Sequence, residues 1–125
     1  MKLSILLPYK ENFSPNYAGA VSLFVKDTTL RSKFKNNIHV FGFTTYKKKL
    51  LQNYVNISLN KKFYQSSSKQ YVNNFIKLEK KINSDVVEIH NRPNYIKIIK
   101  NNLKSKIILY FHNDPLSMNG SKTVK

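Results

Sequence analysis

The chain contains no cysteine and no tryptophan, and it has only three glycines and six acidic residues among 125. The lack of cysteine excludes disulfide bonds, thiolate nucleophiles and cysteine-ligated metals, and it suits the reducing cytoplasm, where we expect the protein. No apolar run approaches the roughly 20 residues that span a bilayer. The short run Leu3-Ser4-Ile5-Leu6-Leu7-Pro8 has neither the length nor the cleavage site of a signal peptide. It predicts a first β-strand instead.

Positive charge, by contrast, is abundant: the formal net charge is +16, and nearly all of it comes from lysine. The only arginines are Arg31 and Arg92, and the lysines are mixed with asparagines and isoleucines along the whole chain. Three interpretations stay open: compositional bias of the genome, attraction to an anionic membrane, and nucleic-acid binding. The scarcity of arginine and glycine disfavours the last of these, and we expect no nucleic-acid partner.

Strand-like and helix-like segments alternate along the chain. Runs that predict strands occur at residues 3–8, 38–43, 54–59, 85–89 and 106–111. Helical spacing of apolar residues predicts three helices: one after Gly19 that ends at Asn36-Asn37, one capped by Ser66-Ser67-Ser68, and one that starts near Pro93. The order β-α-β-β-α-β-α-β predicts one α/β domain over residues 1–125, with a Rossmann-like, doubly wound and mostly parallel sheet.

A His-Asn-x-Pro motif follows two of the predicted strands, as His90-Asn91-Arg92-Pro93 and as His112-Asn113-Asp114-Pro115. Ligands of open parallel sheets bind just outside the carboxyl ends of the strands, so the two motifs predict a polar binding site. His112 could donate a hydrogen bond to a sugar hydroxyl or to a developing charge. Asp114 could orient His112 or start a turn.

The first motif also has a purely structural interpretation, in which Asn91 caps a helix and Arg92 is solvated. In the functional interpretation Arg92 pairs with a carboxylate or a phosphate. Glu88, in the strand before, needs a partner if it is buried, and Arg92 or a lysine is the candidate.

A possible anion site lies at Ala18-Gly19-Ala20, directly before the first predicted helix. Backbone N–H groups and the helix dipole favour a phosphate there, although Gly19 could equally just permit the turn. The pattern is neither G-x-G-x-x-G nor a Walker loop. No metal-binding motif, nucleophile elbow or glycosidase carboxylate pair is present, so we expect no metal and no other cofactor.

Four segments together resemble the N-terminal domain of family 4 glycosyltransferases, which are retaining enzymes of the GT-B type. These segments are Ile5-Leu6-Leu7-Pro8, Gly19-Ala20-Val21-Ser22, the stretch 87–93 and the stretch 110–115. The resemblance covers essentially the whole chain. It implies two Rossmann-like domains that face each other across a cleft, the first binding mainly the acceptor and the second mainly the nucleotide sugar.

The resemblance also implies roles for single residues. Gly19, with Ala18, would form the loop that approaches the donor diphosphate, and His112 would contact the donor sugar at the reacting centre. Many relatives carry two adjacent glycines in that loop, where this chain has Ala18 before Gly19. The acceptor side would be lined by Glu88, His90, Asn91, Arg92, Asn113 and Asp114. The family needs no metal, because helix N-termini and basic side chains stabilise the leaving diphosphate.

The resemblance thus leads us to expect the acceptor-side domain of an enzyme that moves a sugar from a nucleotide-sugar donor to a glycan or lipid-linked acceptor in envelope polysaccharide or lipopolysaccharide synthesis. Such an enzyme would work in the cytoplasm or peripherally at the inner face of the membrane. The C-terminal nucleotide-sugar domain is absent, so we expect a truncated enzyme that is inactive alone. The alternative is a non-catalytic basic α/β module that binds anionic membrane or nucleic acid.

Overall fold

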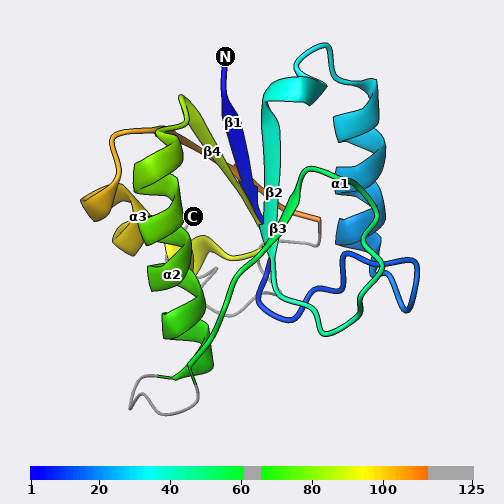
Figure 1. Cartoon of the computed structure of the whole chain (residues 1–125). Coiled ribbons are helices and arrows are strands. Elements are labelled where there is room, and N and C mark those ends of the chain that lie inside the picture. The colour runs from blue at the N-terminus through cyan, green and yellow to red at the C-terminus, as the bar shows by residue number, and fades with distance from the viewer. Residues whose placement is uncertain (61–65, 113–125) are drawn as a thin grey trace.

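The computed structural model describes residues 1–60 and 66–112 of the chain. Five strands form a single all-parallel sheet in the spatial order β3-β2-β1-β4-β5 (Figure 1). The strands are β1 (Leu3–Leu6), β2 (Ile38–Gly42), β3 (Tyr54–Asn56), β4 (Val86–His90) and β5 (Lys106–Tyr110). The α/β class with a parallel sheet is thus confirmed.

Helices connect these strands, except β2 and β3, which an irregular segment joins, and they cover both faces of the sheet. They are α1 (Ala20–Arg31), α2 (Ser67–Ile82) and α3 (Ile96–Asn102), with short 3₁₀ turns η1 (Lys35–Asn37) and η2 (Pro93–Tyr95). Figure 1 shows α1 on one side of the sheet and both α2 and α3 on the other. Within the part of the chain that the structure describes, no helix combines the length and the hydropathy of a membrane span.

Each face of the sheet buries its own apolar cluster, because successive side chains of a strand point to opposite faces. On the α1 side, Ile5 of β1 and Val40 of β2 pack with Val21 and Val25 of the helix. The cluster on the other side is larger and is built from α2, α3 and the opposite faces of the same strands. Its buried members are Leu6, Phe41, Ile57, Tyr71, Val72, Phe75, Ile76, Val87, Ile89, Tyr95 and Ile99.

The second helix starts where its capping residues predict. The side chain of Ser66 accepts a hydrogen bond from Lys69 N at 3.2 Å, and the helix ends at Asn83, whose φ of 58° is left-handed. Tyr71 and Phe75, which lie one helical turn apart, are both fully buried. The predicted apolar face of this helix is therefore correct.

The first helix is shorter than predicted. It ends at Arg31 rather than at Asn36-Asn37, because Ser32 has an extended backbone (φ −73°, ψ 139°). The Ser32 hydroxyl accepts a hydrogen bond from Phe34 N at 3.0 Å, and Phe34 then packs against the core on the α1 side. A local side chain-to-backbone bond thus competes with the last helical turns.

Candidate functional site

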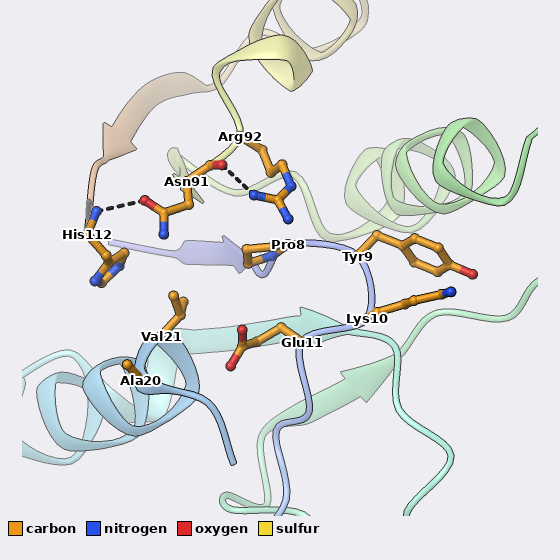
Figure 2. Close-up of a pocket in the computed structure, with 9 residues that line it drawn as sticks. All are labelled: Pro8, Tyr9, Lys10, Glu11, Ala20, Val21, Asn91, Arg92 and His112. Atoms are coloured by element: carbon orange, nitrogen blue, oxygen red, sulfur yellow. Dashed lines mark hydrogen bonds between the residues drawn. The ribbon is translucent and has the colours of Figure 1, made fainter. Parts of the chain in front are cut away.

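A pocket of about 440 Å³ opens at the carboxyl ends of β1 and β4 (Figure 2). Its volume lies in the range of small-molecule sites, roughly 300–1,000 Å³. The loop after β1, the first turn of α1 and the segments after β4 and β5 all contribute to it. The lining residues are Pro8, Tyr9, Lys10, Glu11, Ala20, Val21, Asn91, Arg92 and His112.

The connectivity of the sheet explains why a hollow forms here. From β1 the chain passes through α1 to β2 on one side, whereas from β4 it passes through α3 to β5 on the other side. The connections therefore diverge between these two neighbouring strands, and the loops leave a crevice at their carboxyl ends. Open α/β sheets bind their ligands at such a point.

Two histidines and a carboxylate form a hydrogen-bonded chain that reaches this pocket. Nε2 of His90 lies 2.7 Å from Oε1 of Glu88, and Nδ1 of the same ring lies 2.7 Å from Nε2 of His112. His90 is fully buried, whereas His112 is half-buried and lines the pocket. The chain thus runs from a strand carboxylate, through a buried ring, to a ring that a ligand can reach.

Aromatic neighbours hold the two imidazole rings in place. The rings of His90 and His112 are nearly parallel, with an interplanar angle of 25° and their centroids 5.0 Å apart, and the ring of Tyr110 lies nearly parallel to that of His90 at 5.3 Å. Phe24 of α1 meets His112 edge to face, with the centroids 4.9 Å apart. These contacts restrict the ring torsions, so the hydrogen bonds have a defined geometry.

Asn91 connects the two His-Asn-x-Pro segments. Its Oδ1 accepts a hydrogen bond from His112 N at 2.7 Å, and its own N–H donates to the Tyr110 carbonyl at 2.8 Å. The capping role that the structural interpretation assigned to Asn91 is therefore wrong: the residue before the turn η2 is Arg92, and no side chain caps it. The amide instead ties β4 to the end of β5.

Arg92 does not pair with Glu88, whose partner is His90. The predicted ion pair is thus wrong for a simple reason: Glu88 and His90 are two residues apart in one strand and share a face, whereas Arg92 lies beyond the strand end. The Arg92 Nη1 group donates to the Asn91 carbonyl at 2.7 Å, and its side chain contributes positive charge to the pocket.

The N-terminus of α1 is occupied by a side chain of the protein itself, the carboxylate of Glu11. The Glu11 carboxylate accepts hydrogen bonds from Ser22 N at 3.1 Å and from the Ser22 hydroxyl at 2.7 Å. A Cβ at Gly19 would collide with this carboxylate, so the glycine permits its close approach. Figure 2 shows the carboxylate directed toward the first turn of α1, where Ala20 and Val21 lie. This internal pairing was not foreseen from the sequence.

Two residues of the pocket have a backbone conformation that side chains disfavour. Lys10 has φ 71° and Asn91 has φ 54°. Left-handed backbone costs energy for a residue with a Cβ, and such positions cluster at functional sites. The Lys10 ammonium lies 5.6 Å from the centre of the Tyr9 ring, where a cation is favoured.

Lys10 and Arg92 give the pocket positive charge, whereas the ring of His112 is neutral. Burial lowers the pKa of His112, and the neighbouring His90 lowers it further, while the carboxylates of Glu11 and Glu88 act in the opposite direction. Its ring is therefore predominantly neutral at physiological pH. Such a ring contributes hydrogen bonds to a ligand, while the cationic groups of Lys10 and Arg92 attract negative charge.

Most of the predicted site residues come together. Glu88, His90, Asn91 and His112 form one connected network, and Arg92 adjoins it. Asn113 and Asp114 lie outside the described residues, and neither Ala18 nor Gly19 lines the pocket. Among residues 1–60 and 66–112 there is no group of three or more side chains that could hold a metal ion.

Four contributors to the site were not predicted from the sequence: Lys10, Glu11 and the aromatic pair Phe24 and Tyr110. Glu11 had a usable signal, since it is one of only six acidic residues and follows the first strand closely. No sequence signal distinguished the two rings from ordinary core aromatics.

The arrangement can therefore bind a polar, partly anionic small molecule through a neutral imidazole, an amide and two cationic side chains. No protein-family model matches the chain, and neither any curated protein nor any solved structure matches it.

Proposed function

We propose that this chain is the N-terminal, acceptor-side domain of a retaining glycosyltransferase with a Rossmann-like, doubly wound sheet. The enzyme would move a sugar from a nucleotide-sugar donor to a glycan or lipid-linked acceptor, in the cytoplasm at the inner face of the membrane. The observation that carries the proposal is the pocket at the carboxyl ends of β1 and β4, where neutral His112 lies beside Arg92 and Asn91.

The chemistry of the lining suits a sugar. A sugar presents many hydroxyls, each of which can donate one hydrogen bond and accept others, and it is usually held by a few well-placed polar groups. The imidazole of His112 and the guanidinium of Arg92 are such groups, and the ring of Tyr9 supplies an apolar surface beside them. The resemblance of the four sequence segments to family 4 glycosyltransferases points to the same ligand class.

The position of Glu11 favours the acceptor over the donor diphosphate at this end of α1. Its carboxylate accepts the hydrogen bonds of Ser22 at the helix N-terminus. A second anion there would meet like-charge repulsion. In this proposal the diphosphate lies toward Lys10 and Arg92, and the role of Gly19 is to admit the Glu11 carboxylate.

The alternative, a basic module that docks on membranes or nucleic acid, calls for lysines gathered on one face. In the described residues they lie on both: Lys26 belongs to α1, whereas Lys77 and Lys100 belong to α2 and α3. Lys106 adds charge on the edge strand β5. This distribution disfavours the alternative.

The proposal is tested by NMR titration of the ¹⁵N-labelled full chain with methyl glycosides, a detergent-solubilised lipid-linked sugar, nucleotide sugars, anionic vesicles and short oligonucleotides. We expect carbohydrate-induced shifts centred on Lys10, Asn91 and Arg92. His112→Ala should weaken this binding about tenfold, which corresponds to about 1.4 kcal/mol. His39→Gln is the matched control, because His39 belongs to β2 and does not line the pocket.

Two results would overturn the proposal. One is the absence of shifts with every carbohydrate at millimolar concentration. The other is binding to vesicles or oligonucleotides alone that falls steeply with salt and is unchanged in His112→Ala, which would establish the alternative function instead.

A further inference from the structure

The proton positions in the Glu88–His90–His112 chain follow from counting donors and acceptors. An ionised carboxylate can only accept, so the atom of His90 that faces Glu88, Nε2, carries a hydrogen. When the His90 ring is neutral it has one N–H, so in that state its Nδ1 is an acceptor. Its partner at 2.7 Å, Nε2 of His112, must therefore be the donor.

The same count leaves one ring nitrogen available to a ligand. With its hydrogen on Nε2, neutral His112 has a lone pair on Nδ1. Among the residues that the structure describes, no hydrogen bond involves this Nδ1, and His112 lines the pocket. The carboxylate of Glu88, two hydrogen bonds away, thus determines what the pocket offers to its ligand.

We propose that Glu88 and His90 are positioning residues that present Nδ1 of His112 as a hydrogen-bond acceptor, so that the pocket takes a ligand hydroxyl there and not a phosphate or carboxylate oxygen. This reverses the sequence-based expectation, in which His112 was the donor. The choice of a sugar hydroxyl rests on the proposed function, whereas the proton arrangement rests on the hydrogen bonds alone.

Adding one proton to the histidine pair reverses the preference. If the proton goes to His112, Nδ1 becomes N–H directly. If it goes to His90, both nitrogens of that ring are donors, so Nε2 of His112 must accept and its hydrogen moves to Nδ1. In either case the pocket then offers a donor, which suits an anionic oxygen.

The charged and titratable groups around His90 and His112 determine the pH at which the pair takes up this proton. The titratable and charged side chains that face it from the packed elements are Glu11, Lys10, Glu88, Arg92 and Tyr110. Carboxylates favour the protonated pair, whereas cations and burial disfavour it. Phe24 adds an apolar contact from α1, so the pair is partly shielded from water.

The test is a long-range ¹H–¹⁵N correlation experiment on the histidine rings of the full chain, as a function of pH. Above the protonation midpoint we expect both His90 and His112 to carry hydrogen on Nε2. The third histidine, His39, serves as an internal reference, because it lies on β2 and touches neither ring.

Glu88→Gln is the variant that separates positioning from mere packing, because it keeps the size of the side chain and removes its charge. We expect the protonation midpoint of the pair to move to lower pH and the single proton arrangement to become a mixture. The titration of His39 should stay unchanged. A packing role alone would move neither quantity, provided that the amide spectrum shows an intact fold.

The ligand preference is read with two probes, a methyl glycoside and inorganic phosphate. Above the midpoint the glycoside should shift the His112 Nδ1 resonance and phosphate should not, and the phosphate response should grow as the pH falls through the midpoint. Hydrogen on Nδ1 of His112 above the midpoint would overturn the proposal, and so would a stronger phosphate response there. If the proton arrangement is as expected but no carbohydrate binds, the glycosyltransferase proposal fails and the arrangement stands.

Discussion

The two ends of the sheet each hold a carboxylate in a hydrogen-bonded network, and the networks differ in how they end. At the amino end, Glu79 of α2 accepts hydrogen bonds from the hydroxyl of Ser4, from Ser84 N at 2.7 Å and from the Ser84 hydroxyl at 3.0 Å. All three residues are buried, and the two hydroxyls lie 2.6 Å apart. Every polar group in this cluster has a partner inside it.

At the carboxyl end, the chain that starts from Glu88 is not closed. It passes through buried His90 and ends at His112, whose second ring nitrogen has no hydrogen-bond partner among the described residues. A buried network whose members satisfy one another stabilises the fold, and it has nothing left to offer a ligand. A network that ends on an unpaired nitrogen of a pocket-lining ring can bind one. The comparison therefore separates a carboxylate whose network is closed inside the fold from one whose network reaches a pocket.

The largest effect is expected from Glu79→Ala. It leaves Ser84 N and one of the two serine hydroxyls buried without their carboxylate acceptor, while the other hydroxyl can still donate across the 2.6 Å contact between Ser4 and Ser84. This loss should cost about 3 kcal/mol of unfolding free energy, measured by urea denaturation. Glu79→Gln should cost less, because one acceptor oxygen remains. Lys77→Ala, on the exposed side of the same helix, is the control. A loss below about 0.5 kcal/mol for Glu79→Ala, the level of ordinary surface substitutions, would remove the structural half of the comparison.

A smaller loss, about 1 kcal/mol, is expected from Tyr71→Phe. The buried Tyr71 hydroxyl donates to the Leu7 carbonyl at 2.6 Å, just before the pocket-lining loop. Burial, and to a lesser degree Tyr95 and Tyr54, raise the pKa of Tyr71, so the folded state keeps the neutral phenol. In the unfolded chain the Tyr71 phenol loses its proton near pH 10. The free energy of unfolding should therefore fall as the pH rises above about 10. The variant should show a shallower fall; an identical alkaline profile in both proteins would contradict this assignment.

Glu88→Gln should change stability by less than about 1 kcal/mol, because the amide oxygen can still accept from His90. A comparison of Glu88→Gln with Glu79→Gln tests whether the open network at Glu88 contributes less to the free energy of unfolding than the closed network at Glu79. Urea denaturation of the two variants under one set of conditions gives the answer. A larger loss of unfolding free energy in Glu88→Gln than in Glu79→Gln would show that the Glu88 network stabilises the fold more, contrary to this expectation.

The smallest expected effect is the acid dependence of the free energy of unfolding that comes from His112. Because the pKa of His112 is lowered from 6.5 in the folded chain, the unfolded chain binds more protons just below that value. The free energy of unfolding should therefore decline as the pH falls below about 6.5, with Glu11 and Glu88 opposing the trend. His112→Gln should flatten this decline in urea denaturation curves. An unchanged acid profile would show that the ring is as easily protonated in the folded state as in the unfolded one.

Much of the site could be predicted from local pattern, because the carboxyl ends of parallel strands meet at one edge. His90 and His112 were placed there by the apolar runs before them. The contact between Glu88 and His90 was also readable in principle, since residues two apart share a face of a strand. What local pattern cannot supply is the contact of Glu79 with Ser4, which lies 75 residues away on β1, or the contact of Glu11 with Ser22, which depends on how the intervening loop folds back.

The sequence by itself determined the α/β class, the apolar face of α2 and the presence of polar residues at the strand ends, because all three follow from periodicity over a few residues. Only the tertiary structure decided that the Glu11 carboxylate occupies the start of α1 and that Asn91 binds the backbone of His112. Strand order and packing set these distances, and neither is encoded in any single segment. The contact between the rings of His90 and His112 follows from that packing as well.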